Sequence, residues 1–313
     1  MIFRLSIALA VTIFVQLLMS TPVVAQTNTV WTEPAEIEEG VLTDGDCCDD
    51  GSCNPCCRSC YNCDALFGSA ELTFFRYHRA DGVRVGTSPA NDEVEFDFDV
   101  APRVTVGYKG DDGLVLRTRW WNYDHDASRD EYGSNGSGEF LDVDTFTLDF
   151  EVADVVCLSD CWTPELSGGI RYNEFEETFV DNNGYETRHV SFQGAGGVAG
   201  VQANRRICTG HMVFARIRGA ILMDDKFIRG TYYETEDEAI LRDTTQGMME
   251  LALGYEAHWC IGCGTTVFAR GAGEWQNWYN YSNSFGDLGS NNFSNSPSDV
   301  GFGGFTFALG ILR

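Results

Sequence analysis

The stretch from 247 to 281 alternates apolar and polar residues on both sides of a short turn at 260–264. A period of two is the pattern of a β-strand with one apolar face, so the stretch predicts a long hairpin. Each arm is longer than the about 9–11 residues that a tilted strand needs to cross a bilayer. Aromatic residues gather near the arm ends, as at a membrane interface (Tyr255, Trp259, Trp275, Trp278, Tyr279 and Tyr281). The hairpin therefore predicts a transmembrane β-barrel.

The same alternation predicts ten strands, at 69–79, 94–109, 113–125, 140–153, 163–176, 188–202, 207–222, 246–259, 263–281 and 299–312. Short links (110–112, 154–162, 203–206 and 260–262) alternate with long polar ones (80–93, 126–139, 177–187, 223–245 and 282–298). Outer-membrane barrels have short periplasmic turns, long outer loops and an even number of strands. The expected fold is an all-β, closed antiparallel transmembrane β-barrel of about ten strands (8–12) over residues 64–313.

The N-terminal segments predict an exported protein. Residues 1–25 contain Arg4, an apolar run to Leu18 and a cleavage-site pattern of small residues just before Gln26. This is the pattern of a cleaved signal peptide. Residues 26–46 are acidic and lack apolar periodicity, so we expect a flexible leader. Residues 47–63 hold seven cysteines and predict a short Cys-rich knot. The expected location is the cell outer membrane.

The formal net charge of -26 narrows the classes of partner. Such a charge repels phosphates, so no nucleic acid is expected to bind. It suits an acidic surface protein, a pore that attracts cations or a protein that binds divalent ions. The acidic stretch 223–245 could offer carboxylates to calcium, but it lacks the twelve-residue calcium-loop pattern, and a solvated loop is expected.

The cysteines are candidates for disulfide bonds. Those outside the Cys-rich segment lie in or beside short links, and the natural pairs are Cys157 with Cys161 and Cys260 with Cys263. Cys208 would then pair within the leader set, although the Cys-x-x-Cys spacings there also fit a metal. Export favours disulfides, and neither metal nor cofactor is expected. The candidates are Cys47, Cys48, Cys53, Cys56, Cys57, Cys60, Cys63, Cys157, Cys161, Cys208, Cys260 and Cys263.

Charged residues of both signs fall on the strand faces that parity assigns to the lumen. They could line a pore and select ions by their field. Alternatively, they could pair across a narrow lumen and plug it, because side chains nearly fill small barrels. The candidates are Arg117, Arg119, Asp149, Glu151, Arg171, Arg216, Arg218, Glu250, Glu256, Arg270 and Glu274.

Two histidines have acidic neighbours that catalysis could use. His258 near Glu256 could serve as a base, and His125 lies between Asp124 and Asp126 at the expected outer rim. Adjacency along the chain does not place such groups on one water, so ordinary solvated side chains are expected. We therefore expect that the protein is not an enzyme, and we assign no catalytic residues.

The run Arg103–Tyr108, the turn to Gly113 and the run Leu114–His125 resemble the second hairpin of the Legionella-type pore-forming outer-membrane protein family. The resemblance covers about 64–313. It implies a pore-forming barrel whose partners are outer-membrane lipid and small ions or solutes. Pro102 would need a bulge in such a barrel.

The expected function is a narrow, cation-favouring diffusion pore. One alternative is a plugged structural or adhesive surface barrel whose outer loops do the work. A minor alternative is a barrel enzyme at the outer rim. The sequence does not determine the oligomeric state or the solute.

Overall fold

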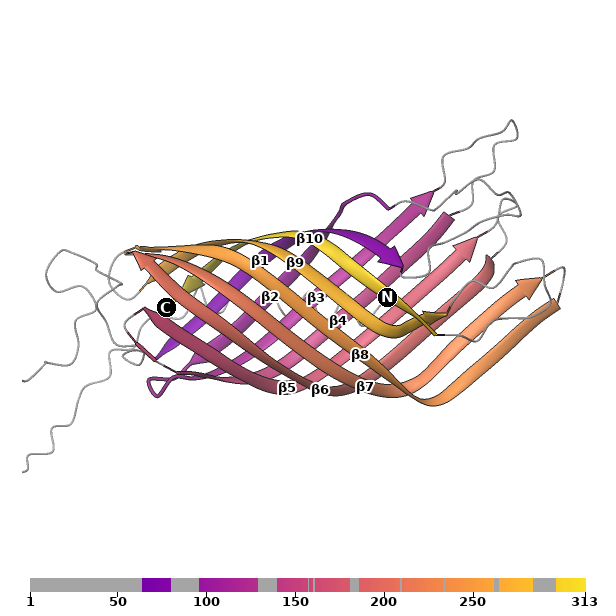
Figure 1. The fold of residues 1–313 in the computed structure, drawn as a ribbon, viewed down its shortest axis with the longest axis horizontal. Coiled ribbons are helices and arrows are strands. Elements are labelled where there is room, and N and C mark those ends of the chain that lie inside the picture. Colours follow the sequence, from indigo (N-terminus) through magenta and orange to yellow (C-terminus); the bar gives the residue numbers. More distant parts are fainter. Residues whose placement is uncertain are drawn as a thin grey trace, which may run out of the picture. The chain divides into compact units, whose positions relative to one another are not determined.

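The computed structural model describes residues 64–79, 96–128, 140–156, 158–159, 161–180, 186–208, 210–232, 235–261, 265–283 and 297–313. Within them ten antiparallel strands form a closed barrel, in which each strand pairs with its neighbours in sequence and β1 pairs with β10 (Figure 1). The expected fold class is therefore confirmed. The strands are β1 (Ala65–Arg79), β2 (Asp99–Lys109), β3 (Leu114–Ser128), β4 (Phe140–Val155), β5 (Trp162–Val180), β6 (Glu186–Cys208), β7 (His211–Tyr232), β8 (Thr235–Cys260), β9 (Thr266–Asn283) and β10 (Pro297–Leu312).

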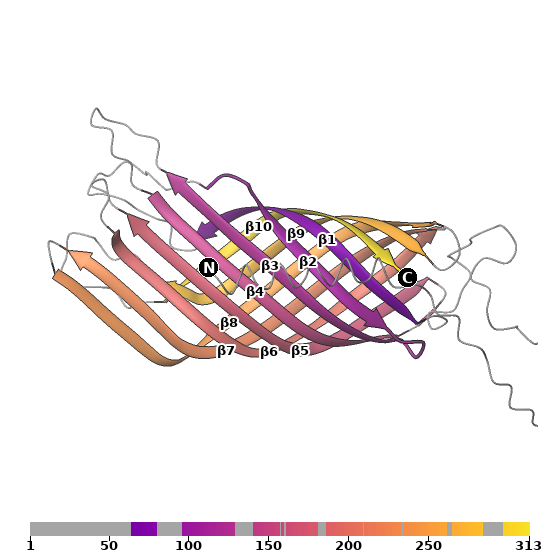
Figure 2. The same ribbon diagram turned by 180° about the vertical axis from the view of Figure 1, so that it is seen from behind.

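The two ends of the barrel differ. The connections after β2, β4, β6 and β8 are short and lie at the end where β1 begins and β10 finishes, which we call the turn end. There Leu66 and Arg313 exchange backbone hydrogen bonds of 2.7 and 2.8 Å, which close the barrel. The other end is called the loop end, and Figure 2 shows the two ends from behind. The proposed signal, leader and Cys-rich knot (1–25, 26–46 and 47–63) lie outside the described residues.

The predicted long loop at 223–245 is wrong, because β7 and β8 continue as a hairpin to Tyr232 and from Thr235. The pairing shifts register between Asp224 and Lys226, where β8 has one more residue than β7, and Asp243 in this bulge has a φ of 53°. The backbone N–H of Asp243 donates to Asp225 Oδ1 at 3.0 Å. The bulge breaks the period of two and bends the hairpin, which projects at the loop end in Figure 1.

Two other expectations about the strands need correction. The predicted link at 203–206 belongs to β6, which continues to Cys208. Pro102 needs no bulge: it pairs with Leu72 of β1 without a register shift, and the ladder between β2 and β3 begins only at Arg103. On the side that faces β3, Pro102 therefore has no ladder hydrogen bond to interrupt. A strand tolerates proline, which lacks a backbone N–H, at such an unpaired position.

Apolar side chains on the outward positions form a band around the barrel. They are exposed to an extent that a water-soluble surface does not favour, and a lipid environment explains them. Among the described residues, no helix is long and apolar enough to cross a membrane. The most exposed members of this lipid band include Leu72, Phe98, Leu116, Phe150, Ile170, Ile217, Ile221, Met223, Leu253, Phe305, Phe307 and Leu309.

Glycines on the lumen side let neighbouring strands approach closely. A Cβ at Gly169, Gly196 or Gly304 would lie 2.0, 1.9 or 1.9 Å from a backbone oxygen of the next strand. Real Cβ atoms do not approach backbone oxygen so closely, so these positions accept no side chain without a backbone shift.

Candidate functional site in the barrel lumen

The eleven side chains predicted as pore-lining candidates lie on the inner face of the wall. Some are buried in mid-lumen and the others border a cavity at the turn end. The structure brings them into ion pairs with one another, so they are neighbours in space although they come from different strands.

A layer of paired charges crosses the middle of the lumen, and we call it the ion-pair layer. Arg171 is its best-paired member: its Nε and Nη2 donate to the two carboxylate oxygens of Asp149 at 2.6 and 2.8 Å. The same Nη2 lies 2.6 Å from Glu250. The layer consists of Arg103, Arg119, Arg171, Arg216 and Arg218 with Glu71, Asp149, Glu151, Glu250 and Glu274.

Two further arginines tie the layer together from opposite sides. Arg103 donates from Nη1 and Nη2 to the carboxylate of Glu274 at 2.8 and 2.9 Å. Arg218 donates to Glu250 at 2.9 Å and to Asp149 at 2.6 Å, and also contacts Glu151. Since every buried carboxylate has at least one guanidinium partner, the cost of burying these charges is offset within the layer.

Sequence reasoning missed Glu71 and Arg103 as members of this layer. Both obey the same lumen parity as the predicted residues. Both lie within strands that the sequence predicted, at 69–79 and 94–109. The parity rule applied to these two strands was the available signal.

The ion-pair layer leaves almost no passage. A cavity of about 10 Å³ lies within it, bordered by Arg119, Asp149, Arg171 and Glu250. A void needs about 10–15 Å³ to hold one water, so this cavity admits at most a single molecule. Because most of the layer's side chains are also buried, the described residues close the lumen at this level.

On the loop-end side of the layer, aromatic rings fill the lumen. The centroid of Trp278 lies 6.0 Å from that of Trp121, 5.1 Å from that of Phe302 and 4.8 Å from that of Tyr281. Solvent does not reach Trp278 or Tyr281. This aromatic cluster consists of Phe75, Tyr77, Phe96, Trp121, Tyr123, Phe175, Phe192, Trp278, Tyr281 and Phe302.

The aromatic cluster corrects the interpretation of Trp278 and Tyr281 as interface residues. Both point inward, whereas Tyr255, Trp259 and Tyr279 are exposed on the outside. Asn280 has a φ of 64°, and the pairing of β9 with β10 shifts register there. This irregularity puts Trp278 and Tyr281, which are three residues apart, on the same face of the strand.

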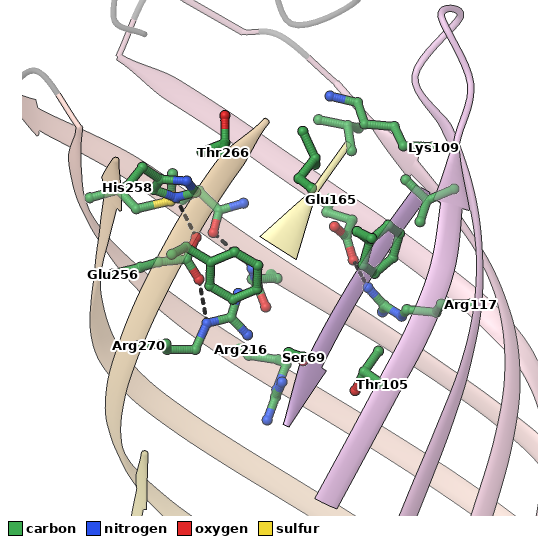
Figure 3. Close-up of a pocket in the computed structure, with 18 of the residues that line it drawn as sticks. Ser69, Thr105, Lys109, Arg117, Glu165, Arg216, Glu256, His258, Thr266 and Arg270 are labelled. Carbon is green, nitrogen blue, oxygen red and sulfur yellow. Dashed lines mark hydrogen bonds and ion pairs between the residues drawn. The ribbon is translucent and has the colours of Figure 1, made fainter. Parts of the chain in front are cut away.

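On the turn-end side of the layer, the lumen widens into a cavity of about 480 Å³, which we call the vestibule. Figure 3 shows two sets of paired charges on its walls. Glu256 accepts a hydrogen bond from Arg270 at 2.5 Å and contacts His258 Nε2 at 2.6 Å. Arg117 donates to Glu151 at 2.7 Å and to Glu165 at 2.5 Å. The wall carboxylates are thus already neutralised by arginine.

The sequence does not show which sign of charge is more common among the side chains that border the vestibule. Among the described residues that border it, seven are arginine or lysine and four are glutamate. The cations are Lys109, Arg117, Arg119, Arg206, Arg216, Arg218 and Arg270, and the glutamates are Glu71, Glu151, Glu165 and Glu256. By number, cationic side chains therefore exceed glutamates along the described lining, and Arg119, Arg216 and Arg218 among them are paired with carboxylates of the ion-pair layer.

The residues considered for catalysis do not converge. Asp124 and Asp126 are exposed on the outside, whereas His125 turns inward and its Nδ1 lies 3.2 Å from Asp99. Opposite faces of one strand cannot act on one water. His258 is held by Glu256, as described above. In the described part of the chain, no group of three or more metal-ligating side chains could hold a metal ion.

No disulfide bond joins the three cysteines that the structure describes, Cys161, Cys208 and Cys260, to one another. Cys161 and Cys208 are exposed at the turn end, and Cys260 is partly exposed at the end of β8. The disulfide partners proposed for Cys161 and Cys260, which are Cys157 and Cys263, lie outside the described residues, as do the seven cysteines of the leader.

Comparison with known proteins decides the family. Residues 55–312 match the family described as Legionella pneumophila major outer membrane protein precursor. The chain belongs to this family. Its barrel is thus an outer-membrane barrel, and the predicted membership of the Legionella-type family is confirmed. A search of curated proteins gives no match.

Solved outer-membrane barrels are similar at a more distant level. The protease OmpT of Escherichia coli is 9% identical with a TM-score of 0.44, covering 80% of this chain and 96% of its own. The toluene transporter TbuX of Ralstonia pickettii is 9% identical with a TM-score of 0.32, covering 80% and 89%. A FadL homologue of Pseudomonas aeruginosa is 7% identical with a TM-score of 0.32, covering 80% and 90%. At these scores the similarity carries no functional argument.

Proposed function

We propose that this outer-membrane barrel is a narrow transport pore that is closed in the conformation described here. The observation that carries the proposal is the vestibule, a cavity of about 480 Å³ bordered by several charged side chains, which enters the lumen from the turn end and stops at the ion-pair layer. A barrel that served only as an anchor would have no use for a charged cavity inside the membrane. Charges are costly to bury there, so a functional role is the default expectation.

The ion-pair layer is a suitable gate because its bonds can be exchanged. A guanidinium that releases one carboxylate can pair with another or with a passing ion, whereas packed apolar groups have no such alternative. Arg119 and Arg216 hold their carboxylates at 3.2 to 3.8 Å, whereas the ion pairs of Arg171 and Arg218 are 2.9 Å or shorter. We expect opening to begin at these two arginines.

The charge of the vestibule points to anions rather than to the cations expected from the net charge. The cavity lining has more arginine and lysine than glutamate. Many described carboxylates lie instead on the outer surface at the loop end, where Asp124, Asp126, Asp142 and Asp144 face one another across β3 and β4. Selectivity depends on the charges along the path. The proposed pore therefore favours anions.

Single-channel recording tests the proposal. The full-length protein in a planar bilayer is expected to give infrequent small steps, with a reversal potential in a KCl gradient that favours chloride. Lys109→Glu, at the vestibule wall, should shift that potential toward potassium. Arg205→Glu is the matched control, because Arg205 lies outside over the ring of Trp162 at 5.4 Å. Cation preference in the wild type would contradict the anion assignment.

A plugged barrel with functional outer loops is the second candidate. The aromatic cluster favours it, because its rings fill the loop-end half of the lumen. Complete silence in bilayers, for a protein shown to insert, would support this candidate and reject the pore. We propose no catalytic role for the barrel, since Asp124, His125 and Asp126 diverge.

A further inference from the structure

The floor of the vestibule carries a guanidinium with few partners. Within the described residues, Arg216 has a single ion pair, in which Nη2 lies 3.6 Å from Glu274, and its buried Nε has no hydrogen-bond partner. Glu274 is occupied by the two shorter bonds from Arg103 and by one from Thr306 at 3.1 Å. Arg216 therefore retains most of its capacity to donate hydrogen bonds.

Arg119 lies beside Arg216 and is also weakly held. Its Nη1 is 3.2 Å from Glu250 and its Nη2 is 3.8 Å from Glu274. Both arginines border the vestibule, and the two positive charges repel each other. A pair of guanidinium groups with spare donors at the end of a cavity is an arrangement that recognises an anion.

The vestibule walls on the turn-end side of Arg216 and Arg119 indicate which chemical groups the rest of a ligand would have. The strand order places Phe67 and Phe268 nearer the turn end than Glu71 and Arg270, and both rings border the vestibule. The vestibule is also lined by neutral polar side chains, which are Ser69, Thr105, Gln202 and Asn204. The volume of about 480 Å³ is within the range of small-molecule sites. An anion with a small apolar body fits these walls.

Among the described residues, the wall carboxylates of the vestibule are already paired and offer no competing site for a cation. Glu256 is held between Arg270 and His258, and Glu151 and Glu165 share Arg117. Their carboxylates have little capacity left for a cation. The uncompensated donors are thus concentrated at Arg216 and Arg119.

We infer that the vestibule floor is a binding site for a small organic carboxylate. The carboxylate receives hydrogen bonds from Arg216 and Arg119, and the apolar body lies toward Phe67 and Phe268. Binding needs only the vestibule, so the inference goes beyond the proposed function and does not require the lumen to open.

Isothermal titration calorimetry of the full-length protein in detergent tests the inference, with benzoate as the probe. Benzoate is expected to bind, and uncharged benzamide of the same shape at least tenfold more weakly. Arg216→Gln removes the charge at a position with one long ion pair, and should weaken benzoate binding at least tenfold. Arg205→Gln, an outward arginine, should leave the affinity of the wild type unchanged.

Equal affinities for benzoate and benzamide, or an unchanged affinity in the Arg216→Gln variant, would overturn the inference. If that variant does not fold, the wild type decides: inorganic phosphate must displace benzoate, and failure to displace it rejects an anion site. The two proposals fail separately. Benzoate binding by a protein that gives no current in the bilayer rejects the pore and supports the carboxylate site. Chloride current without benzoate binding supports the pore and rejects the carboxylate site.

Discussion

Arg171 on β5 and Asp149 on β4 stand opposite each other in the strand ladder and form a two-pronged ion pair inside the lumen. The pair is buried, and Asp149 also receives a bond from Arg218. A guanidinium and a carboxylate arranged in this way are held by geometry as well as by charge. The mid-lumen is thus rigid at Arg171 and looser at Arg216.

Replacing Arg171 with methionine is expected to destabilise the barrel by about 3–5 kcal/mol, because Asp149 and Glu250 lose a buried partner. Urea unfolding in lipid vesicles, followed by tryptophan fluorescence, measures the change. Arg205→Met serves as the control, since it removes one exposed contact with Trp162 worth at most about 1 kcal/mol. Equal losses in the two variants would show that the ion-pair layer has no special role in stability.

Removing the indole of Trp278 is expected to open the loop-end half of the lumen. The Trp278→Ala variant leaves a void between Trp121, Tyr281 and Phe302, and should cost about 3–5 kcal/mol of stability. Single-channel conductance should rise above that of the wild type. Phe305→Ala, in the lipid band, should not change conductance. An unaltered conductance in Trp278→Ala would mean that the barrier lies in the ion-pair layer alone.

Two adjacent glycines should respond differently to a methyl group. In Gly196→Ala the new Cβ would lie 1.9 Å from the carbonyl oxygen of Ile221, so a loss of more than about 1 kcal/mol is expected. In Gly197→Ala the Cβ meets nothing within 4 Å, and a change within about 0.5 kcal/mol is expected. The two variants are compared by the temperature at which each barrel stops migrating on a gel as a compact, folded species. Similar temperatures would argue against close strand approach.

Asp142 lies beyond the lipid band, at the loop end of β4, and its stability contribution should depend on pH. Burial raises the pKa of Asp142, and the nearby charges of Asp124, Asp144, Asp126 and Glu176 raise it further. A raised folded pKa means that protonation stabilises the fold at low pH and that this stabilisation is lost as the pH rises through the folded pKa.

The Asp142→Asn variant should therefore be more stable than the wild type at neutral pH, and the gain should disappear below about pH 4, where the unfolded carboxyl is also protonated. Urea midpoints at the two pH values measure this. Asp154→Asn, at the turn end of the same strand, is the control and faces Leu114 and Leu166 rather than acids. A gain that is equal at both pH values would contradict the electrostatic origin.

The exposed thiols of Cys161 and Cys208 report which side of the membrane the turn end faces. A bulky maleimide added to intact cells should leave both unlabelled, and should label both after the outer membrane is opened, because short turns lie on the periplasmic side of such barrels. Peptide mapping identifies the labelled cysteines. Asp126→Cys, exposed at the loop end, should be labelled on intact cells. Labelling only after reduction would show that the thiols are paired in cells.

The strand number and the inner and outer faces were predictable because both follow from a period of two. That period fails where the backbone bulges, at Asp243 and at Asn280, and there the interpretation of 223–245 as a loop and of Tyr281 as an interface residue went wrong. A bulge inserts a residue into one strand only, and a single sequence does not show which residue it is.

The partners inside the lumen were not predictable from the sequence. Arg103 and Glu274 are separated by 171 positions, and they meet because the barrel closes and its strands are staggered. Parity identifies which side chains face the lumen, but their heights depend on the stagger of all ten strands. The composition of the vestibule lining was hidden for the same reason, since the net charge of -26 counts the whole chain.

The ion-pair layer has a consequence for how the barrel is assembled. Its members come from β1 to β5 and from β7 to β9, so no single hairpin among the described strands can complete it. A barrel in which β1 has not met β10, or has met it in the wrong register, leaves arginines and carboxylates unmatched within the bilayer. The layer thus acts as a checkpoint for assembly, because only the correctly sealed cylinder neutralises every charge at its centre.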